Sequence, residues 1–534
     1  MIAKIISWST HNRFFVWIGI LLIPAMTSSQ SNFIHTYGGA NFENAAGIVA
    51  AKDGGYLICG YSASFDSSGA SIYLLKVDSA GNHVFSKTYG GSAYDIPTGL
   101  AASFDGGYAI SGITWSFGAG DADAFLLKTD SMGNFLWMKT LGTVTRDKPF
   151  GMVQTSDSGF AISGTVKYDP VSANIDEKIF LLKTDANGNL QWFKTYGGTA
   201  NEESASIIQS YEGGFLIAGY TQSFGAGSND CYVLKTDSTG NMLWAKTFGT
   251  SLAETGNAVI QTQDSGYAII GTSEDCGFGN GDILLIRLNS DGDTLWSKCY
   301  GSSAFESASQ IIQAGNENLM ILGLSIHASN YDILLAEVDG QGNLLNSVKI
   351  GSGGEQSPSG LCAAQDASWI VAGQSNTDAD PYNDLFVAKI EADGEAACFT
   401  EPLNMSVKPI ALSITDGVQL FAKNFIEQSH TPSVFITNTT TKNFCSLNPT
   451  EEKKLDAIKV FPNPFTDFIM FKMRLHQESE LQLRIYDVMS RMVIMENFKG
   501  TEILMDGRRL SAGIYFYSLK GEQEFSVKGI IVKH

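Results

Sequence analysis

"FIHTYGG" occupies residues 33–39, and close copies end longer units elsewhere, as "VFSKTYGG" at 84–91 and "QWFKTYGG" at 191–198. The glycine after the Thr-Tyr pair, or after its variants, recurs in steps of 52, 52, 55, 52, 52 and 50 residues. A second glycine, Gly60 in the first unit, recurs with the same steps. Two independent markers therefore define seven internal repeats. The first markers are Gly38, Gly90, Gly142, Gly197, Gly249, Gly301 and Gly351.

Each repeat contains four short apolar or alternating segments that are typical of β-strands. In the first repeat they are "GIVAAK", "GYLICGYS", "SIYLLKVD" and "HVFSKTY", separated by turns such as "DGG" and "DSAGN". Radial packing of such four-stranded meanders buries their faces against neighbours. We therefore predict an all-β fold in which residues 30–400 form a seven-bladed β-propeller. The repeats resemble kelch repeats in length and aromatic content, although a single glycine follows the second strand.

The isolated first copy predicts how the ring closes. The seventh repeat supplies three strands, ending at "DLFVAKIEADGE", and the following "AACFTEP" is a poor fourth strand. We expect residues 33–39 to fill this outer position, so that the two ends of the propeller pair without a covalent link.

An acidic residue follows each marker glycine by five positions, or by four in the last repeat. This series is Glu43, Asp95, Asp147, Glu202, Glu254, Glu306 and Glu355. A second series, Asp123, Asp230, Asp282, Asp332 and Asp384, precedes the third strand, with Ser71 and Lys178 at the two remaining positions. One hypothesis is an acidic funnel that binds Ca²⁺ or a basic ligand. The other is that each carboxylate accepts backbone N–H bonds between blades, which strict repetition favours.

The loops indicate which face of the propeller carries a site. The extra residues of the third repeat lie between Gly164 and Gly197. We assign them to "VKYDPVSANIDEK", on the face that also carries the blade-to-blade connections. The opposite face carries tight turns. A binding site is expected on the variable face. Lys76, Lys128, Lys183, Lys235, Lys389 and Arg287 end the third strands, and we interpret them as a solvated row that shields strand edges.

Composition and motifs exclude several functions. The formal net charge of −20 argues against nucleic acid as a partner. The sequence contains no zinc-type cysteine spacing, no GxSxG and no HExxH, so we expect binding rather than catalysis, with an enzyme assembled from scattered loop residues as the alternative. Cys398 and Cys445 are a candidate disulfide, and Cys59, Cys231 and Cys362 are expected to be lone buried thiols.

The two termini indicate export. Residues 1–29 combine Lys4 and Arg13 with "FFVWIGILLIPAM" and "TSSQ", the order of a secretory signal peptide, and no later run is long enough to span a membrane. Residues 401–456 are predicted to be a connecting segment whose fold we leave open.

Residues 457–534 carry "PNP" at 462–464, "IYD" followed by Arg491, "AGIYF" at 512–516 and a basic final strand. They resemble the C-terminal sorting domain of the type IX secretion system of Bacteroidetes-type bacteria, although Ser490 stands where that family usually has glycine.

The resemblance implies a small β-sandwich, contact with the type IX machinery, and passage through the periplasm to the cell surface or outside. The sequence therefore favours a secreted or surface propeller that binds or adheres to a glycan or protein. The alternatives are a secreted hydrolase or lyase acting on polysaccharide or protein, and a purely structural surface protein.

Overall fold

The structure is a computed structural model that describes residues 32–533 with internal gaps. The signal segment, Cys398, Cys445, "PNP" and Arg491 lie outside the described residues. The gaps are 66–68, 168–176, 328–329, 352–353, 378–379, 392–399, 417–418, 422–425, 431–432, 437–439, 444–457, 462–467, 474–479, 487–491, 500–501 and 522–525.

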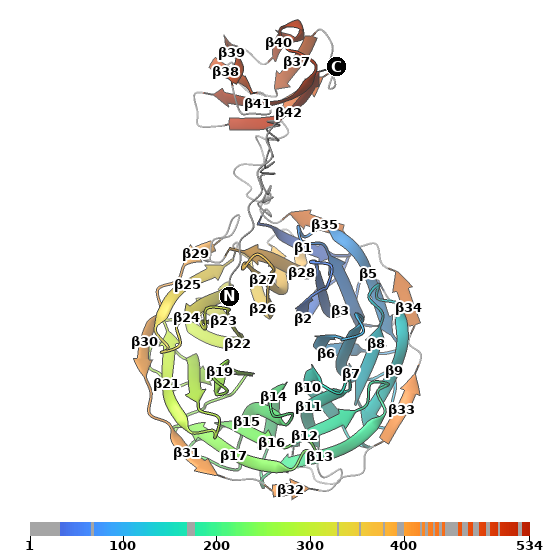
Figure 1. Ribbon diagram of the computed structural model, residues 1–534, viewed down its shortest axis with the longest axis vertical. Helices are drawn as coiled ribbons and strands as arrows, with labels where there is room; N and C mark the ends of the chain where they lie inside the picture. The colour runs from blue at the N-terminus through green and yellow to red at the C-terminus, as the bar shows by residue number, and fades with distance from the viewer. Residues whose placement is uncertain are drawn as a thin grey trace, which may run out of the picture. The chain divides into compact units, whose positions relative to one another are not determined.

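Seven blades surround a central axis, which confirms the predicted propeller (Figure 1). The first contains β2 (Glu43–Ala50), β3 (Tyr56–Ser62), β4 (Ser71–Val77) and β5 (His83–Gly90). The second contains β6 (Asp95–Ala102), β7 (Tyr108–Thr114), β8 (Asp123–Thr129) and β9 (Phe135–Gly142). The third contains β10 (Asp147–Gln154), β11 (Phe160–Lys167), β12 (Glu177–Thr184) and β13 (Leu190–Gly197). The fourth contains β14 (Glu202–Gln209), β15 (Phe215–Thr221), β16 (Asp230–Thr236) and β17 (Met242–Gly249).

The remaining blades follow the same plan. The fifth contains β18 (Ala258–Gln261), β19 (Tyr267–Ser273), β20 (Asp282–Leu288) and β21 (Thr294–Gly301). The sixth contains β22 (Phe305–Gln313), β23 (Leu319–His327), β24 (Asn330–Val338) and β25 (Leu344–Ile350). The seventh contains β26 (Gln356–Ala363), β27 (Trp369–Thr377), β28 (Asp380–Ile390) and β1 (Ile34–Gly38).

The N-terminal strand closes the ring as predicted. β1 pairs antiparallel with β28, with Ile34 opposite Ala388 and Tyr37 opposite Leu385. Adjacent blades are joined by hydrophobic clusters, one of which combines Tyr37 with Ile58 of the first blade and Ile370 of the last. The chain ends are therefore joined by a strand ladder and by a shared core.

The recurring Lys-Thr-Tyr-Gly sequence connects neighbouring blades. The buried Tyr196 hydroxyl donates to the Gly240 carbonyl oxygen at 2.6 Å, in the Asp-Ser-Thr-Gly-Asn turn of the next blade. Tyr37, Tyr89 and Tyr300 make the same bond to the next turn. Lysines of the fourth strand, such as Lys246, also donate to these turns, here to the Gly292 carbonyl at 3.0 Å. The motif therefore marks contacts between blades as well as a strand.

The second marker glycine follows from close packing inside each blade. A Cβ placed on Gly60 would lie 1.9 Å from the Asn44 carbonyl oxygen of the inner strand. This carbonyl precedes a β-bulge between Ala45 and Gly47, and comparable register shifts occur in five other inner strands. Only glycine lets the inner strand approach this closely.

Residues 400–443 form a belt, a result that the sequence did not predict. Its seven short strands each add a fifth strand to the outside of one blade, in the reverse of chain order, as the outer row of short strands in Figure 1 shows. The strands are β29 (Thr400–Pro402) on β25, β30 (Ser406–Pro409) on β21, β31 (Ser413–Asp416) on β17, β32 (Gln419–Phe421) on β13, β33 (Ile426–His430) on β9, β34 (Ser433–Ile436) on β5 and β35 (Thr440–Asn443) on β1.

Side chains also hold the belt to the ring. Ser297 Oγ donates to the Ile410 carbonyl at 2.6 Å, and Ser347 Oγ donates to the Leu403 carbonyl at 2.5 Å. The His430 ring lies 4.9 Å from the ring of Phe117 and hydrogen-bonds Thr140. The belt thus covers most outer edges that four-stranded blades would leave unpaired.

The C-terminal region that follows the belt contains two further β-sheets. One sheet contains β36 (Ile458–Phe461), β37 (Phe468–Met473) and β40 (Glu502–Asp506), and the other contains β38 (Glu480–Tyr486), β39 (Met492–Lys499), β41 (Gly513–Gly521) and β42 (Ser526–Lys533). A short 3₁₀ helix, η3, spans Gly507–Arg509. Ile469 and Phe471 of one sheet share a core with Leu483 and Ile485 of the other. Among the described residues, no helix has the length and hydropathy to cross a membrane.

Candidate functional site

Six carboxylates of the first acidic series are buried hydrogen-bond acceptors. Glu43, Asp95, Asp147, Glu202, Glu254 and Glu306 are each 0% exposed. Each accepts the backbone N–H of the residue four positions earlier, at 2.6 to 3.0 Å. Five also accept a Ser or Thr hydroxyl at or near the end of the second strand. Asp147, opposite Val166, accepts the Thr143 hydroxyl instead. Protein donors therefore account for these carboxylates.

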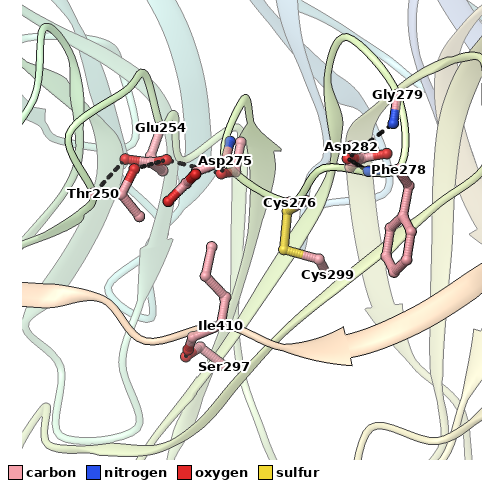
Figure 2. The surroundings of a disulfide bond; sticks show 11 residues. Thr250, Glu254, Asp275, Cys276, Phe278, Gly279, Asp282, Ser297, Cys299 and Ile410 are labelled. Atoms are coloured by element: carbon pink, nitrogen blue, oxygen red, sulfur yellow. Dashed lines mark hydrogen bonds between the residues drawn. A yellow bond between two sulfur atoms is a disulfide. The ribbon is translucent and has the colours of Figure 1, made fainter.

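The second acidic series holds the loop before the third strand. In the fifth blade Asp282 accepts the N–H groups of Phe278 at 3.2 Å and Gly279 at 3.5 Å (Figure 2). Asp230 likewise accepts two N–H groups in the fourth blade. Burial, followed by the nearby Glu306 charge, raises the pKa of Asp282.

The two series meet at the marker glycines. A Cβ on Gly38 would lie 1.9 Å from Asp384 Oδ1 and 2.7 Å from Glu43 Oε2. Burial raises the pKa of Glu43, and Asp384 raises it further, against hydrogen bonds from Ser62, Ser64 and Gly39. The glycine is therefore retained because two acidic side chains converge on its Cα.

Two junctions depart from this pattern. Glu355 is exposed, and Gln356 occupies the equivalent position, fully buried with its side-chain amide on Ser375. The spacing of four residues therefore placed the last acidic residue one position too early. In the third blade Lys178, 1% exposed, lies with its Nζ 3.4 Å from Glu202 Oε2.

The basic row that ends the third strands is buried, so the prediction of a solvated row was wrong. Lys183 pairs with Asp157 at 2.9 Å, and Arg287 makes two 2.6 Å bonds to Asp264. Lys76, Lys128 and Lys389 pair in the same way, and Lys235 lies 3.8 Å from Glu212. Their partners are the acidic residues of the "DGG"-type turns, which lie beside the end of the third strand. The row ties the tight turns to the sheets.

The structure contains a disulfide between Cys276 and Cys299 in the fifth blade (Figure 2). It joins the loop before β20 to β21, beside the point where Ser297 holds the belt. Cys59 and Cys231 are buried free thiols, as predicted, whereas Cys362 is free but only partly buried. The predicted Cys398–Cys445 pair lies outside the described residues.

The buried carboxylates present a variable rim on one face of the ring. We call this face the connection face, because it carries the blade-to-blade loops. In each blade, the residue before the buried acid, or before Gln356 in the seventh blade, and the residue opposite it on the second-strand side form a rim pair, joined by a backbone hydrogen bond or by strand register. The rim pairs, in blade order, are Phe42 and Ala63, Tyr94 and Trp115, Arg146 and Lys167, Asn201 and Gln222, Ala253 and Glu274, Phe305 and Ile326, and Glu355 and Asn376.

The rim is asymmetric at the second and third blades. Tyr94 is 54% exposed and Trp115 is 38% exposed, and the exposed Arg146 lies with its Cζ 5.6 Å above the Trp115 ring. Val144, 66% exposed, stands where the other repeats have Ala, Ser, Thr or Gly. We call Tyr94, Trp115, Val144 and Arg146 the aromatic patch.

A polar cluster continues from the aromatic patch into the fourth blade. Lys148 pairs with Glu177 at 2.9 Å, and Tyr220 donates to Glu203 at 3.2 Å. Burial raises the pKa of Glu203; Tyr220 lowers it, while Glu177 raises it. The equivalent residues in other blades are mostly uncharged, so this cluster also breaks the symmetry. Among the described residues, no three His, Cys, Asp or Glu side chains gather as a metal site would require.

Comparison with known proteins identifies the C-terminal residues and the class of protein to which they point. Residues 459–533 match the family model described as the secretion system C-terminal sorting domain. Together with the ring of blades, this defines a secreted surface propeller protein of the Bacteroidetes type. The chain carries a type IX sorting domain at its C-terminus, which implies contact with that secretion system and delivery to the cell surface or outside.

Matches to the remainder are distant. The regulatory protein FlaEY of Caulobacter vibrioides is 23% identical over 239 residues, 38% of this chain, so the match spans about a quarter of that relative's length (24%). An extracellular domain assigned to a one-component system of B. thetaiotaomicron is 11% identical with a TM-score of 0.39, over 93% of this chain and 59% of that one.

Two further solved structures are similar at the same level. PorZ, a surface component of the type IX secretion system of Porphyromonas gingivalis, is 8% identical with a TM-score of 0.25, over 94% of this chain and 100% of that one. Sqt1 from Chaetomium thermophilum is 10% identical with a TM-score of 0.40, over 68% and 99%.

Proposed function

We propose that this protein is a binding module, exported by signal peptide and sorting domain, that holds an extracellular glycan or protein on the connection face. One observation carries the proposal. The buried carboxylates and their donors repeat around the ring, whereas the rim pairs that they position differ from blade to blade. A purely structural protein has no need of such variation on a constant support, while a binding surface does.

The support is rigid, which suits recognition. Tyr94 and Trp115 flank Asp95 and Thr114, whose side chains are hydrogen-bonded and buried. Their backbones therefore lose little freedom when a ligand binds, and less binding energy is spent on ordering.

The test is binding of the purified full-length protein to immobilised oligosaccharides and extracellular proteins. We expect retention of at least one ligand, and loss of it when rim residues of the connection face are changed. Phe104→Ser and Tyr211→Ser are the matched controls, since both side chains are exposed, at 60% and 67%, in tight turns of the opposite face. Binding that depends only on these control residues would contradict the proposal.

The polar cluster favours one alternative function, a glycosidase that uses Glu203 and Glu177. Glu203, with its raised pKa, and Glu177 lie near each other, and two carboxylates in unlike environments are the usual equipment of a glycosidase. Release of reducing ends from a retained oligosaccharide, lost in Glu203→Gln, would favour a hydrolase over a binding module.

A further inference from the structure

The aromatic patch has the chemistry of a site for a particular kind of ligand. Resting on the proposed binding function, we infer that Tyr94, Trp115 and Arg146 bind a glycan that bears isolated carboxylated sugars, such as uronic acids. The C–H face of a pyranose ring lies on the exposed aromatic surface, and the guanidinium pairs with the sugar carboxylate.

The aromatic part of the argument comes from where large apolar groups are exposed. In six of the seven repeats the residue two positions after the marker glycine is Ala, Ser, Thr or Gly, and only Val144 is large. Tyr94 and Trp115 add two large aromatic side chains to the rim of the second blade. In the fourth blade, by contrast, the rim pair is the polar Asn201 and Gln222. Exposed apolar groups gathered in one sector mark an interaction surface. Tyr and Trp offer a flat face with a polar edge, which suits a sugar.

The charge of the patch selects an anionic ligand. Arg146 and Lys167 are the basic residues among the rim pairs, and both belong to the third blade. The exposed Arg146 guanidinium lies with its Cζ 5.6 Å from the Trp115 ring centroid. A planar guanidinium held against an aromatic ring presents its edge donors to a carboxylate in bidentate fashion.

The same charges argue against a dense polyanion. A nucleic acid backbone requires several cations in a row, and the formal net charge of the chain is −20. One guanidinium over the Trp115 ring, with Tyr94 paired to Trp115 in the sheet, fits one carboxylate on a mostly neutral sugar chain. We therefore infer a sparsely charged glycan rather than RNA, DNA or a polyphosphate.

The patch is fixed by the buried acids below it. Asp95, next to Tyr94, accepts the Thr114 hydroxyl at 2.5 Å and the Ser116 hydroxyl at 2.8 Å, which holds the residues on either side of Trp115. Asp147 accepts the Thr143 N–H at 2.6 Å next to Arg146. The rim side chains can therefore be replaced while the support stays intact.

The experiment measures binding of the full-length protein to oligosaccharides that end in glucuronic, galacturonic or sialic acid, and to the methyl ester of each. We expect at least one acid to bind, with at least tenfold weaker binding to its methyl ester. Trp115→Ala should weaken binding at least tenfold. Arg146→Gln should remove the preference for the acid over the ester. Both variants should keep the melting temperature of the unaltered protein.

The control and the remaining outcomes separate this inference from the proposed function. Phe104→Ser, in an exposed tight turn of the opposite face, should leave binding unchanged. Equal binding of acid and ester, or retention only of neutral glycans or proteins, would overturn the inference while the binding function survives. Failure of every ligand, including a single-stranded oligothymidylate, would overturn both. Binding of that oligonucleotide through Trp115 would replace the glycan with nucleic acid.

Discussion

Changing Glu254 to glutamine distinguishes a hydrogen-bonding ring from a cation site. The Glu254 carboxylate accepts the Thr250 N–H at 2.6 Å, the Thr250 hydroxyl at 2.9 Å and the Ser273 hydroxyl at 2.8 Å. A hydrogen bond to a charged group contributes about 1 kcal/mol more than a neutral one, so three bonds set an upper limit of about 3 kcal/mol. The neutral amide costs less to bury, which offsets part of this loss.

We therefore expect Glu254→Gln to lower the free energy of unfolding by about 1–3 kcal/mol, or the Tm by about 2 °C per kcal/mol. Thermal and chemical denaturation of the full-length protein, each with and without Ca²⁺, measure the effect. Gln356 shows that the amide fits this position, so the variant should still fold. Glu355→Gln is the matched control, because that exposed carboxylate should matter by less than about 0.5 kcal/mol.

The change in Tm on adding Ca²⁺ tests whether the acidic ring is a hydrogen-bonding device or a cation site. A ligand at 100 times its Kd stabilises a protein by about 2.7 kcal/mol, and a ring of hydrogen-bonded carboxylates predicts no such rise in Tm. A rise in the unaltered protein that disappears in Glu254→Gln would show that the acidic ring binds cations. The hydrogen-bonding interpretation would then be wrong.

Three further predictions follow from the contacts between parts of the chain. A chain that ends at residue 391 lacks the belt. We expect its ring to be closed but less stable, with a lower Tm and faster proteolysis. An unchanged Tm would show that the belt contributes little to stability. Tyr196→Phe removes the hydroxyl that donates to Gly240 and should cost about 1–3 kcal/mol by denaturation, because that buried carbonyl loses a partner; a cost near zero would mean that water replaces the hydroxyl. Burial alone would raise the pKa of Asp157, but hydrogen bonds led by that from Lys183 lower the pKa to about 2. The ionised Asp157 therefore stabilises the fold above the ordinary pKa of 3.8, and this stabilisation is lost as the pH falls towards 2. Asp157→Asn should flatten this part of the stability–pH profile between pH 4 and 2, and an unchanged slope would contradict the assignment.

The sequence predicted the ring because the repeated elements obey repeated rules. The marker glycines, the four segments and the isolated "FIHTYGG" correspond to close packing, strands and the closing ladder. The belt escaped prediction because each of its strands spans three to five residues and pairs along one edge only, so no hydrophobic period is required of it.

At the candidate site, the sequence repeats predicted the buried acids better than they predicted the exposed rim residues. The buried acids were found by their spacing, but the shift from Glu355 to Gln356 depends on a shorter connection that spacing alone does not reveal. A repeated spacing in the sequence could have predicted the ion pairs of the third strands. Lys76 and Asp53 are 23 residues apart, and Lys389 and Asp366 have the same separation. The aromatic patch has no motif, because Tyr94 and Trp115 become neighbours only through the sheet.

The reverse order of the belt determines how a pull on the tail is transmitted. Force applied at the C-terminus reaches β35 first, where His35 to Gly38 face Asn443 to Thr440, and then the other belt strands one blade at a time. Each pairing is a few residues long, so we expect the belt to be released one strand at a time, while the core that Tyr37 shares with the first and last blades holds β1 in place. We therefore expect tension at the C-terminus to lengthen the belt before the ring opens.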